Sequence, residues 1–254
     1  MLPQQDQQIS KNKRRKIPLL IVAVLLVFVL GAVVAVLFMV YGHNTDKQYR
    51  AVQERTSSII AICADTVTSD DGNIDAVVQK SKQKQQALTQ EMSKLDSMSD
   101  IFQDTSLKSA FETFTQETDR CGQRLALVIE TNEKLTPLID SFWNEFDKTK
   151  TDSSRIDVIH SYRQKFETIS TMTGEANKSY ITQMITDMKK IEKVYAEKAV
   201  GWQQALNNRM TTLSGYTDSW TNSWSKEANK LKVRAPEFSK LDSLLFSKIL
   251  EEEN

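Results

Sequence analysis

Residues 107–146 read LKSAFETFTQETDRCGQRLALVIETNEKLTPLIDSFWNEF and decide the fold of this chain. Apolar and small side chains recur here at alternating steps of three and four residues, which is typical of a helix packed along one seam. The pattern continues past Pro137 in the same phase, so the sequence predicts either a long helix kinked at Pro137 or a new helix that opens there. The stripe consists of Leu107, Phe111, Phe114, Thr118, Cys121, Leu125, Val128, Asn132, Leu135, Ile139, Phe142 and Phe146.

The same spacing recurs on both sides of this stretch, and no segment beyond residue 44 alternates convincingly with the period of two expected of a strand. Glycine (7) and proline (4) are scarce among the 254 residues, which argues against turn-rich β-sandwiches. The sequence therefore predicts an all-α fold with coiled-coil-like packing, in which about six to eight helices form one elongated bundle or two stacked sub-bundles. The sub-bundles would span residues 42–150 and 151–254, which meet at the polar linker 148–154.

Among the helices predicted in the second half of the chain, two have defined limits. Apolar residues from Ile181 to Leu213 predict one helix of about forty residues, in which Gly201 and Gly215 are weak points and Gly215 is the preferred end. A shorter amphipathic helix is predicted to start at Ala235-Pro236, because proline suits the first turn of a helix. Its apolar face is formed by Phe238, Leu241, Leu245 and Ile249.

The N-terminal region has a different character. Residues 17–41, IPLLIVAVLLVFVLGAVVAVLFMVY, carry no charge, and as a helix they would reach about 37 Å, more than the ~30 Å hydrocarbon core of a bilayer. The sequence predicts a transmembrane signal anchor, with a cleaved signal peptide and a buried core helix as the alternatives. Five basic residues in the arm 1–16 precede this stretch, so the positive-inside rule predicts a single-pass cell-membrane protein with a cytoplasmic N-terminus, the lipid bilayer as a partner and an extracytoplasmic domain 42–254.

The two cysteines, Cys63 and Cys121, would be able to pair in a secreted domain. Cys63 lies about 27 Å along a helix that begins near Thr45, and Cys121 lies about 22 Å along one that begins near Ser106. The two heights agree to within about one turn, and both cysteines lie on apolar stripes. The sequence therefore predicts a disulfide between them, with two buried free thiols as the alternative.

Charge and motifs argue against most catalytic and binding chemistries. Lys and Arg (33) balance Asp and Glu (33), and basic residues are spread along the chain, so nucleic-acid binding lacks an electrostatic basis. The histidines are His43 and His160, and the chain contains no HExxH, CxxC, P-loop or GxGxxG motif, so no metal, cofactor or catalytic residue is predicted. The turn 70–73 fails as a calcium loop, because valines would occupy its first and twelfth positions.

Three tryptophans are candidates for an interaction site. Trp143 lies between Phe142 and Phe146, which together cover more than one face of their helix, whereas Trp220 and Trp224 share one helix face. The spacing of the second pair is also that of core packing, which is the favoured interpretation. Asn177-Lys178-Ser179 is a glycosylation sequon, which is meaningful only in a eukaryotic secretory pathway.

These observations predict a non-enzymatic, membrane-anchored helical bundle that binds an unidentified protein, or itself, or serves as an envelope scaffold, through exposed helix faces. A sensor or ligand-binding ectodomain is the alternative, and it would need a signalling partner and an enclosed pocket between helices. An anchored hydrolase is a further alternative. It would need two carboxylates, or His160 and a nucleophile, in one cleft.

Overall fold

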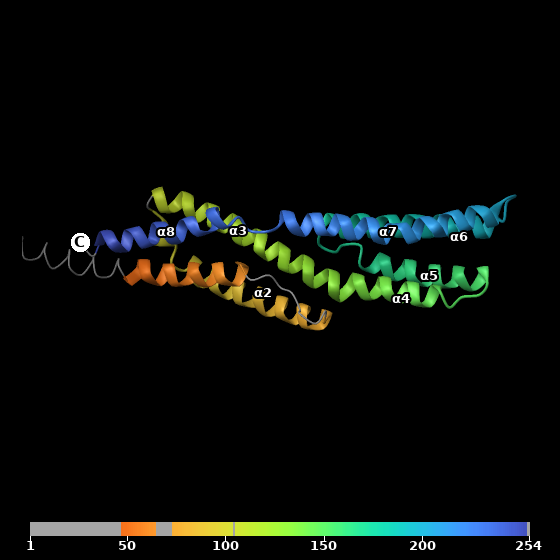
Figure 1. Ribbon diagram of the computed structural model, residues 1–254, viewed down its shortest axis with the longest axis horizontal. Helices are drawn as coiled ribbons and strands as arrows, with labels where there is room; N and C mark the ends of the chain where they lie inside the picture. The colour runs from red at the N-terminus through yellow and green to blue at the C-terminus, as the bar shows by residue number, and fades with distance from the viewer. Residues whose placement is uncertain (1–46, 65–72, 104, 253–254) are drawn as a thin grey trace, which may run out of the picture. The chain divides into compact units, whose positions relative to one another are not determined.

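The computed structural model describes residues 47–64, 73–103 and 105–252. All the regular secondary structure in these ranges is helical, and none of these residues belongs to a β-strand. The prediction of an all-α fold is therefore confirmed (Figure 1). The helical segment 47–64 is followed by α2 (Ile74–Asp96), η1 (Ser99–Gln103), α3 (Thr105–Glu130), η2 (Thr131–Leu135), α4 (Thr136–Phe146), α5 (Asp152–Thr168), α6 (Glu175–Glu197), α7 (Trp202–Lys230) and α8 (Ala235–Glu252).

Pro137 lies inside a continuous helical path formed by α3, η2 and α4. The path stays helical because η2 is a π-helical turn, in which the N–H of Thr136 donates to the carbonyl of Thr131, five residues earlier. Proline cannot donate such a bond, and it is tolerated here because it lies in the first turn of α4. Both sequence-based alternatives hold in part: the helical path is continuous through a wider turn, and Pro137 lies in the first turn of a separate segment, α4.

The single helix of about forty residues predicted from Ile181 is wrong, because the chain divides it into α6 and α7. Lys198 (φ 45°) and Gly201 (φ 80°) adopt left-handed conformations, which end α6 and reverse the chain. Gly215, the predicted end, lies within α7 instead. A glycine inside a helix costs only about 1 kcal/mol, which the packing of α7 against α6 outweighs.

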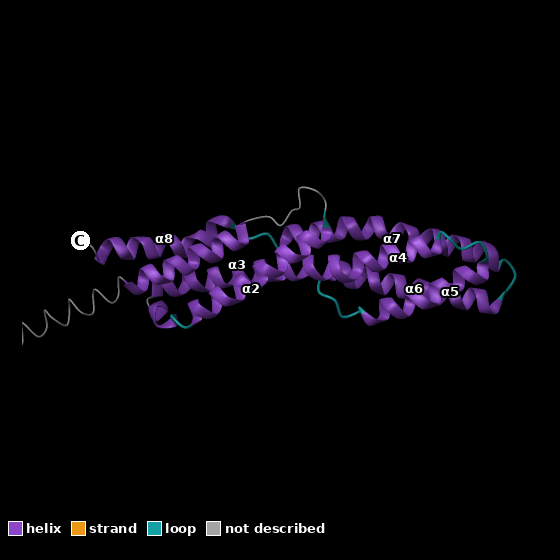
Figure 2. Ribbon diagram, turned by 90° about the horizontal axis from the view of Figure 1, so that it is seen from below, coloured by secondary structure: helices purple, strands orange, loops and turns teal. Residues whose placement is uncertain are grey.

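The buried side chains form two clusters within the compact unit that begins at Tyr49. The first cluster combines the segment 47–64, α2, η1, α3 and α8, and the second combines η2, α4, α5, α6 and α7. Figures 1 and 2 show α3 running beside α2 and α8, and α6 beside α5 and α7. The sub-bundles 42–150 and 151–254 stay a prediction, but the buried clusters do not follow that boundary. Helix α4 belongs to the second cluster, and α8 returns to the first.

The structure corrects the predicted membrane location. In the part of the chain that the structure describes, no helix has both the length and the apolarity to cross a bilayer. Each long helix there is amphipathic, as α6 shows by carrying Lys189, Lys190 and Lys193 beside its buried apolar residues. The predicted span, residues 17–41, and the basic arm 1–16 lie outside the described residues. The predicted single-pass, extracytoplasmic arrangement is therefore not supported.

Candidate functional site

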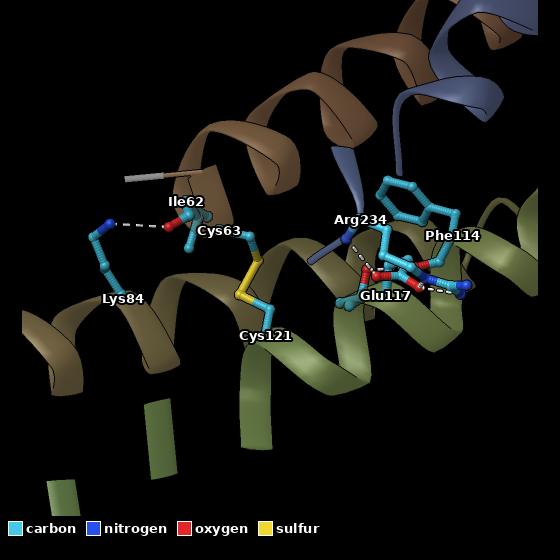
Figure 3. The surroundings of a disulfide bond; sticks show 8 residues. Ile62, Cys63, Lys84, Phe114, Glu117, Cys121 and Arg234 are labelled. Atoms are coloured by element: carbon cyan, nitrogen blue, oxygen red, sulfur yellow. Dashed lines mark hydrogen bonds and ion pairs between the residues drawn. A yellow bond between two sulfur atoms is a disulfide. The ribbon is translucent and has the colours of Figure 1, made fainter. Parts of the chain in front are cut away.

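The predicted cysteine pair is joined in the structure. Cys63, near the end of the segment 47–64, forms a disulfide with Cys121 on α3, and their Cα atoms are 5.7 Å apart (Figure 3). Both cysteines are buried, at 9% and 5% exposure. Lys84 on α2 donates a hydrogen bond of 2.9 Å to the carbonyl of Ile62, so α2 and α3 both hold the end of this segment. A cavity of about 40 Å³ beside the disulfide has room only for water-sized molecules.

One turn before Cys121 on α3, the carboxylate of Glu117 is buried and binds Arg234, the residue that precedes α8 (Figure 3). It accepts hydrogen bonds from the backbone N–H of Arg234 at 2.8 Å and from the guanidinium Nε at 2.7 Å. Burial by itself would raise the pKa of Glu117, but these hydrogen bonds outweigh it and hold the pKa below its usual value. The pair anchors the start of α8 on α3.

Sequence reasoning missed Glu117, although a signal was present. Glu117 lies three residues after Phe114 and four before Cys121, so a helix places it on the buried seam. A carboxylate on such a seam requires a partner. The sequence does not show that Arg234, 117 positions away, provides it.

Helix α8 packs with one face, and its exposed side holds an uncharged strip bordered by the exposed Lys240 and Glu251. Phe238, Leu241, Leu245 and Ile249 are buried, as predicted for the apolar face, and Phe238 stacks on Phe114 of α3 at 4.9 Å between ring centroids. On the adjoining side, Asp242 accepts a hydrogen bond of 2.8 Å from Ser57 of the segment 47–64. The exposed side holds what we call the outer α8 face, namely Ser239, Ser243, Phe246, Ser247 and Leu250.

The outer α8 face is less polar than its serines suggest. Each serine hydroxyl donates back to the carbonyl four residues earlier, at 2.9 Å for Ser239, 3.2 Å for Ser243 and 3.1 Å for Ser247. The donors are therefore used within the helix. Phe246 is 53% exposed and Leu250 is 44% exposed, one turn apart on the same face. The result is a surface of small and apolar side chains suited to packing against another helix.

The predicted interface tryptophans lie on α4 and α7 and not on the outer α8 face, and Trp220 and Trp224 bond to the same buried polar network. The indole N–H of Trp220 donates to Asn177 Oδ1 at 3.0 Å, and that of Trp224 donates to Thr131 Oγ1 at 3.0 Å. Both acceptor residues are buried. Trp143, on α4, contacts other aromatic rings and, like Trp220, packs against the second cluster. These contacts agree with the core-packing interpretation, and the interface role stays a prediction.

The sequon residue Asn177 is committed to this buried network. Its side chain is fully buried, and its Nδ2 donates to Thr131 Oγ1 at 2.8 Å and to the carbonyl of Thr173 at 3.0 Å. A glycan would have to be attached to this same nitrogen atom. The folded chain therefore does not present Asn177 for modification.

Other polar groups of the second cluster bind one another across helices. Asp187 on α6 accepts hydrogen bonds from Tyr216 on α7 and from Lys190, the latter at 2.9 Å. The bond to Asp187, together with burial, raises the pKa of Tyr216 to about 12. Glu117 lies on α3, which contributes to the first cluster, and Asp187 lies on α6, which contributes to the second, and each carboxylate has its own partners.

The ligand-binding alternative requires an enclosed pocket, and the hydrolase alternative requires catalytic side chains in one cleft. His160 is 57% exposed on α5 and contacts Glu192, and none of the described serines or cysteines hydrogen-bonds to its ring. A hollow of about 550 Å³ between α2 and α3 is open to solvent rather than enclosed. Among the residues whose positions are given, no three His, Cys, Asp or Glu side chains gather as a metal site.

No protein-family model matches the chain, and neither a characterised protein nor a solved structure is detectably similar to it.

Proposed function

We propose that this protein is a non-enzymatic helical scaffold that binds another protein through the outer α8 face. The observation that carries the proposal is that Phe246 and Leu250, two of the four large apolar residues exposed in the described part of the chain, lie one turn apart on a strip of α8 that carries no charge. Solvent-facing sides of helices are ordinarily charged. An exposed helix face with large apolar residues one turn apart is the form in which helices dock on protein surfaces.

The packing of α8 supports this role. Its apolar face is held in the first cluster, and its start is fixed by the ion pair between Glu117 and Arg234. The outer α8 face therefore lies on a helix that the fold already holds in place, so binding would cost little conformational entropy. Affinity would come mainly from Phe246 and Leu250, because large apolar side chains dominate helix-docking interfaces.

Site-specific photo-crosslinking tests this proposal. A photoreactive residue placed at Ser247 in the full chain is expected to crosslink to a protein partner, and the additional change Phe246→Lys is expected to abolish the crosslink. The matched control position is Thr211, an exposed residue on α7 whose hydroxyl also bonds the carbonyl four residues earlier. Equal crosslinking from both positions, or a crosslink at 247 that survives Phe246→Lys, would contradict the proposal.

A further inference from the structure

We propose that the partner of the outer α8 face is the same face of a second copy of this chain, with the two α8 helices antiparallel. This inference rests on the proposed function and specifies its partner. It follows from two independent properties of α8, the distribution of side-chain size along the face and the placement of the charges that border it.

Side-chain size changes along the outer α8 face. The N-terminal half presents two small residues, Ser239 and Ser243, and the C-terminal half presents the two large ones, Phe246 and Leu250. In an antiparallel pair that crosses near residues 245–246, Leu250 fits over Ser239 and Ser243 of the second copy, and Phe246 packs on Phe246 of the second copy at the centre. In a parallel pair the large side chains of the two copies would meet each other, and the serines would meet serines. That arrangement leaves a gap at the serines.

The charges at the border of the face fit the same arrangement. Lys240 and Glu251 are exposed and lie about three turns apart on one edge of α8. Within α8, Glu251 already pairs with Lys248 at 3.3 Å. When two antiparallel helices cross midway between Lys240 and Glu251, each lysine faces the glutamate of the other copy and shares it with Lys248. In a parallel pair the two copies of this edge lie on opposite sides of the contact, so Lys240 of one copy does not reach Glu251 of the other. Such border pairs add little affinity and instead decide orientation.

The arrangement is self-complementary, so it closes with twofold symmetry and does not propagate into a fibre. A single pair of short helices buries less surface than the ~1,600 Å² of a typical stable complex. We therefore expect a weak dimer that responds strongly to single substitutions at its centre.

Sedimentation velocity of the full chain between about 1 and 200 µM is the test, because weak dimers dissociate across this range. We expect a reversible monomer–dimer equilibrium in the parent chain. Phe246→Lys should raise the dimer Kd at least about tenfold, whereas Thr211→Lys on α7 should leave it unchanged. Lysine suits the C-terminal part of a helix, so the thermal midpoint of Phe246→Lys should stay within about 2 °C of the parent. This second measurement separates loss of pairing from loss of folding.

Charge reversal tests the orientation. Lys240→Glu and Glu251→Lys should each raise the dimer Kd, and the double variant should restore it, because the exchanged charges face each other again across the two copies. Weakening by both single changes without restoration would overturn the antiparallel pairing.

Two further outcomes bear on the proposal. A full chain that stays monomeric throughout this range, or a dimer unaffected by Phe246→Lys, overturns self-pairing through α8. If position 247 then crosslinks to a different protein in a Phe246-dependent way, the proposed function stands while the identity of the partner does not. If neither a dimer nor a crosslink is found, the proposed function and the self-pairing of α8 are both contradicted.

Discussion

Glu227 on α7 provides the N-terminal cap that Gly174 cannot give to α6. Gly174 occupies the capping position with φ 95° and has no side chain to accept a hydrogen bond. The carboxylate of Glu227 accepts instead from the backbone N–H groups of Glu175 at 2.8 Å and Ala176 at 2.9 Å. The start of α6 is therefore satisfied by a residue about fifty positions away, which couples the formation of α6 to the packing of α7.

Removing this cap should destabilise the protein. We expect Glu227→Ala to lower the free energy of unfolding by about 1–2 kcal/mol, the usual cost of losing a helix cap. Glu197→Ala, at the other end of α6, is the control, because its exposed ion pair with Lys193 at 3.7 Å contributes about 0.5 kcal/mol or less. Urea titrations of the two variants measure the difference, and equal costs would show that Glu227 does not act as a cap.

Gly174→Ala and Gly215→Ala each add one methyl group, and we expect them to change the stability of the protein in opposite directions. At Gly174 a Cβ would lie 2.5 Å from Leu127 Cδ1 on a backbone with φ 95°, so Gly174→Ala should cost about 2 kcal/mol or more. At Gly215 no atom beyond the neighbouring residues and the local helix backbone lies within 4 Å of the added Cβ, and the residue is within α7. Gly215→Ala should therefore stabilise by about 0.5–1 kcal/mol. Thermal unfolding of both variants checks the two signs, and destabilisation at both positions would contradict the prediction.

Acid should destabilise the protein through its paired carboxylates. For Glu117, Glu130 and Asp187, burial alone would raise the pKa, but hydrogen bonds to the ionised form outweigh it and lower the pKa below the ordinary 4.5 for glutamate and 3.8 for aspartate. A carboxyl group with a depressed folded-state pKa stabilises fully above its unfolded value and loses that contribution as pH falls through the folded value. Stability should therefore be nearly level at higher pH and should fall as pH drops below about 4.5.

Glu117→Gln isolates one of these contributions. The variant should be less stable than the parent at neutral pH, because it loses the charge that Arg234 binds, and the difference should shrink as pH falls toward 3. Urea midpoints measured between pH 3 and 7 provide the comparison. A constant difference across this range would show that ionised Glu117 does not contribute.

The disulfide should contribute strongly to stability. Cys63 and Cys121 are 58 residues apart, and on the chain-entropy account a bond closing a loop of that length is worth about 4 kcal/mol. We expect the double variant Cys63→Ser, Cys121→Ser to lose stability of this order. Peptide maps with and without reductant establish whether the bond is present in the parent chain. A parent chain that remains as stable after reduction as before would contradict the prediction.

The buried network at Asn177 should show coupling between its members. Asn177→Ala leaves the indole N–H of Trp220 without its acceptor, and we expect a loss of about 2–3 kcal/mol. Trp220→Phe removes that donor, so the double variant should be less destabilised than the sum of the two single changes. Unfolding free energies of the four proteins form a double-mutant cycle, in which strict additivity would contradict the hydrogen bond as described.

Local features of the fold could be predicted from the sequence because they depend on neighbouring residues. The stripe from Leu107 to Phe146 indicated a helical path through Pro137, either as one kinked helix or as a new helix that opens there, and the apolar face of α8 agrees with the buried Phe238, Leu241, Leu245 and Ile249. The cysteine pairing was also predictable, since helix rise converts sequence distance into height. The break near Gly201 was placed wrongly, because both glycines weaken a helix and only packing decides which one ends it.

The candidate site depended on contacts that sequence periodicity does not contain. The spacing of apolar residues shows which face of a helix is buried but not which helix covers it. The return of α8 to the first cluster, the partner of Glu117 and the exposure of Phe246 all follow from that long-range pairing. The sequence by itself thus determined that the described part of this chain is helical and where most of its stripes run. Only the tertiary structure decided which stripes meet and which face of α8 is left to solvent, because that choice is made by contacts between residues far apart in the chain.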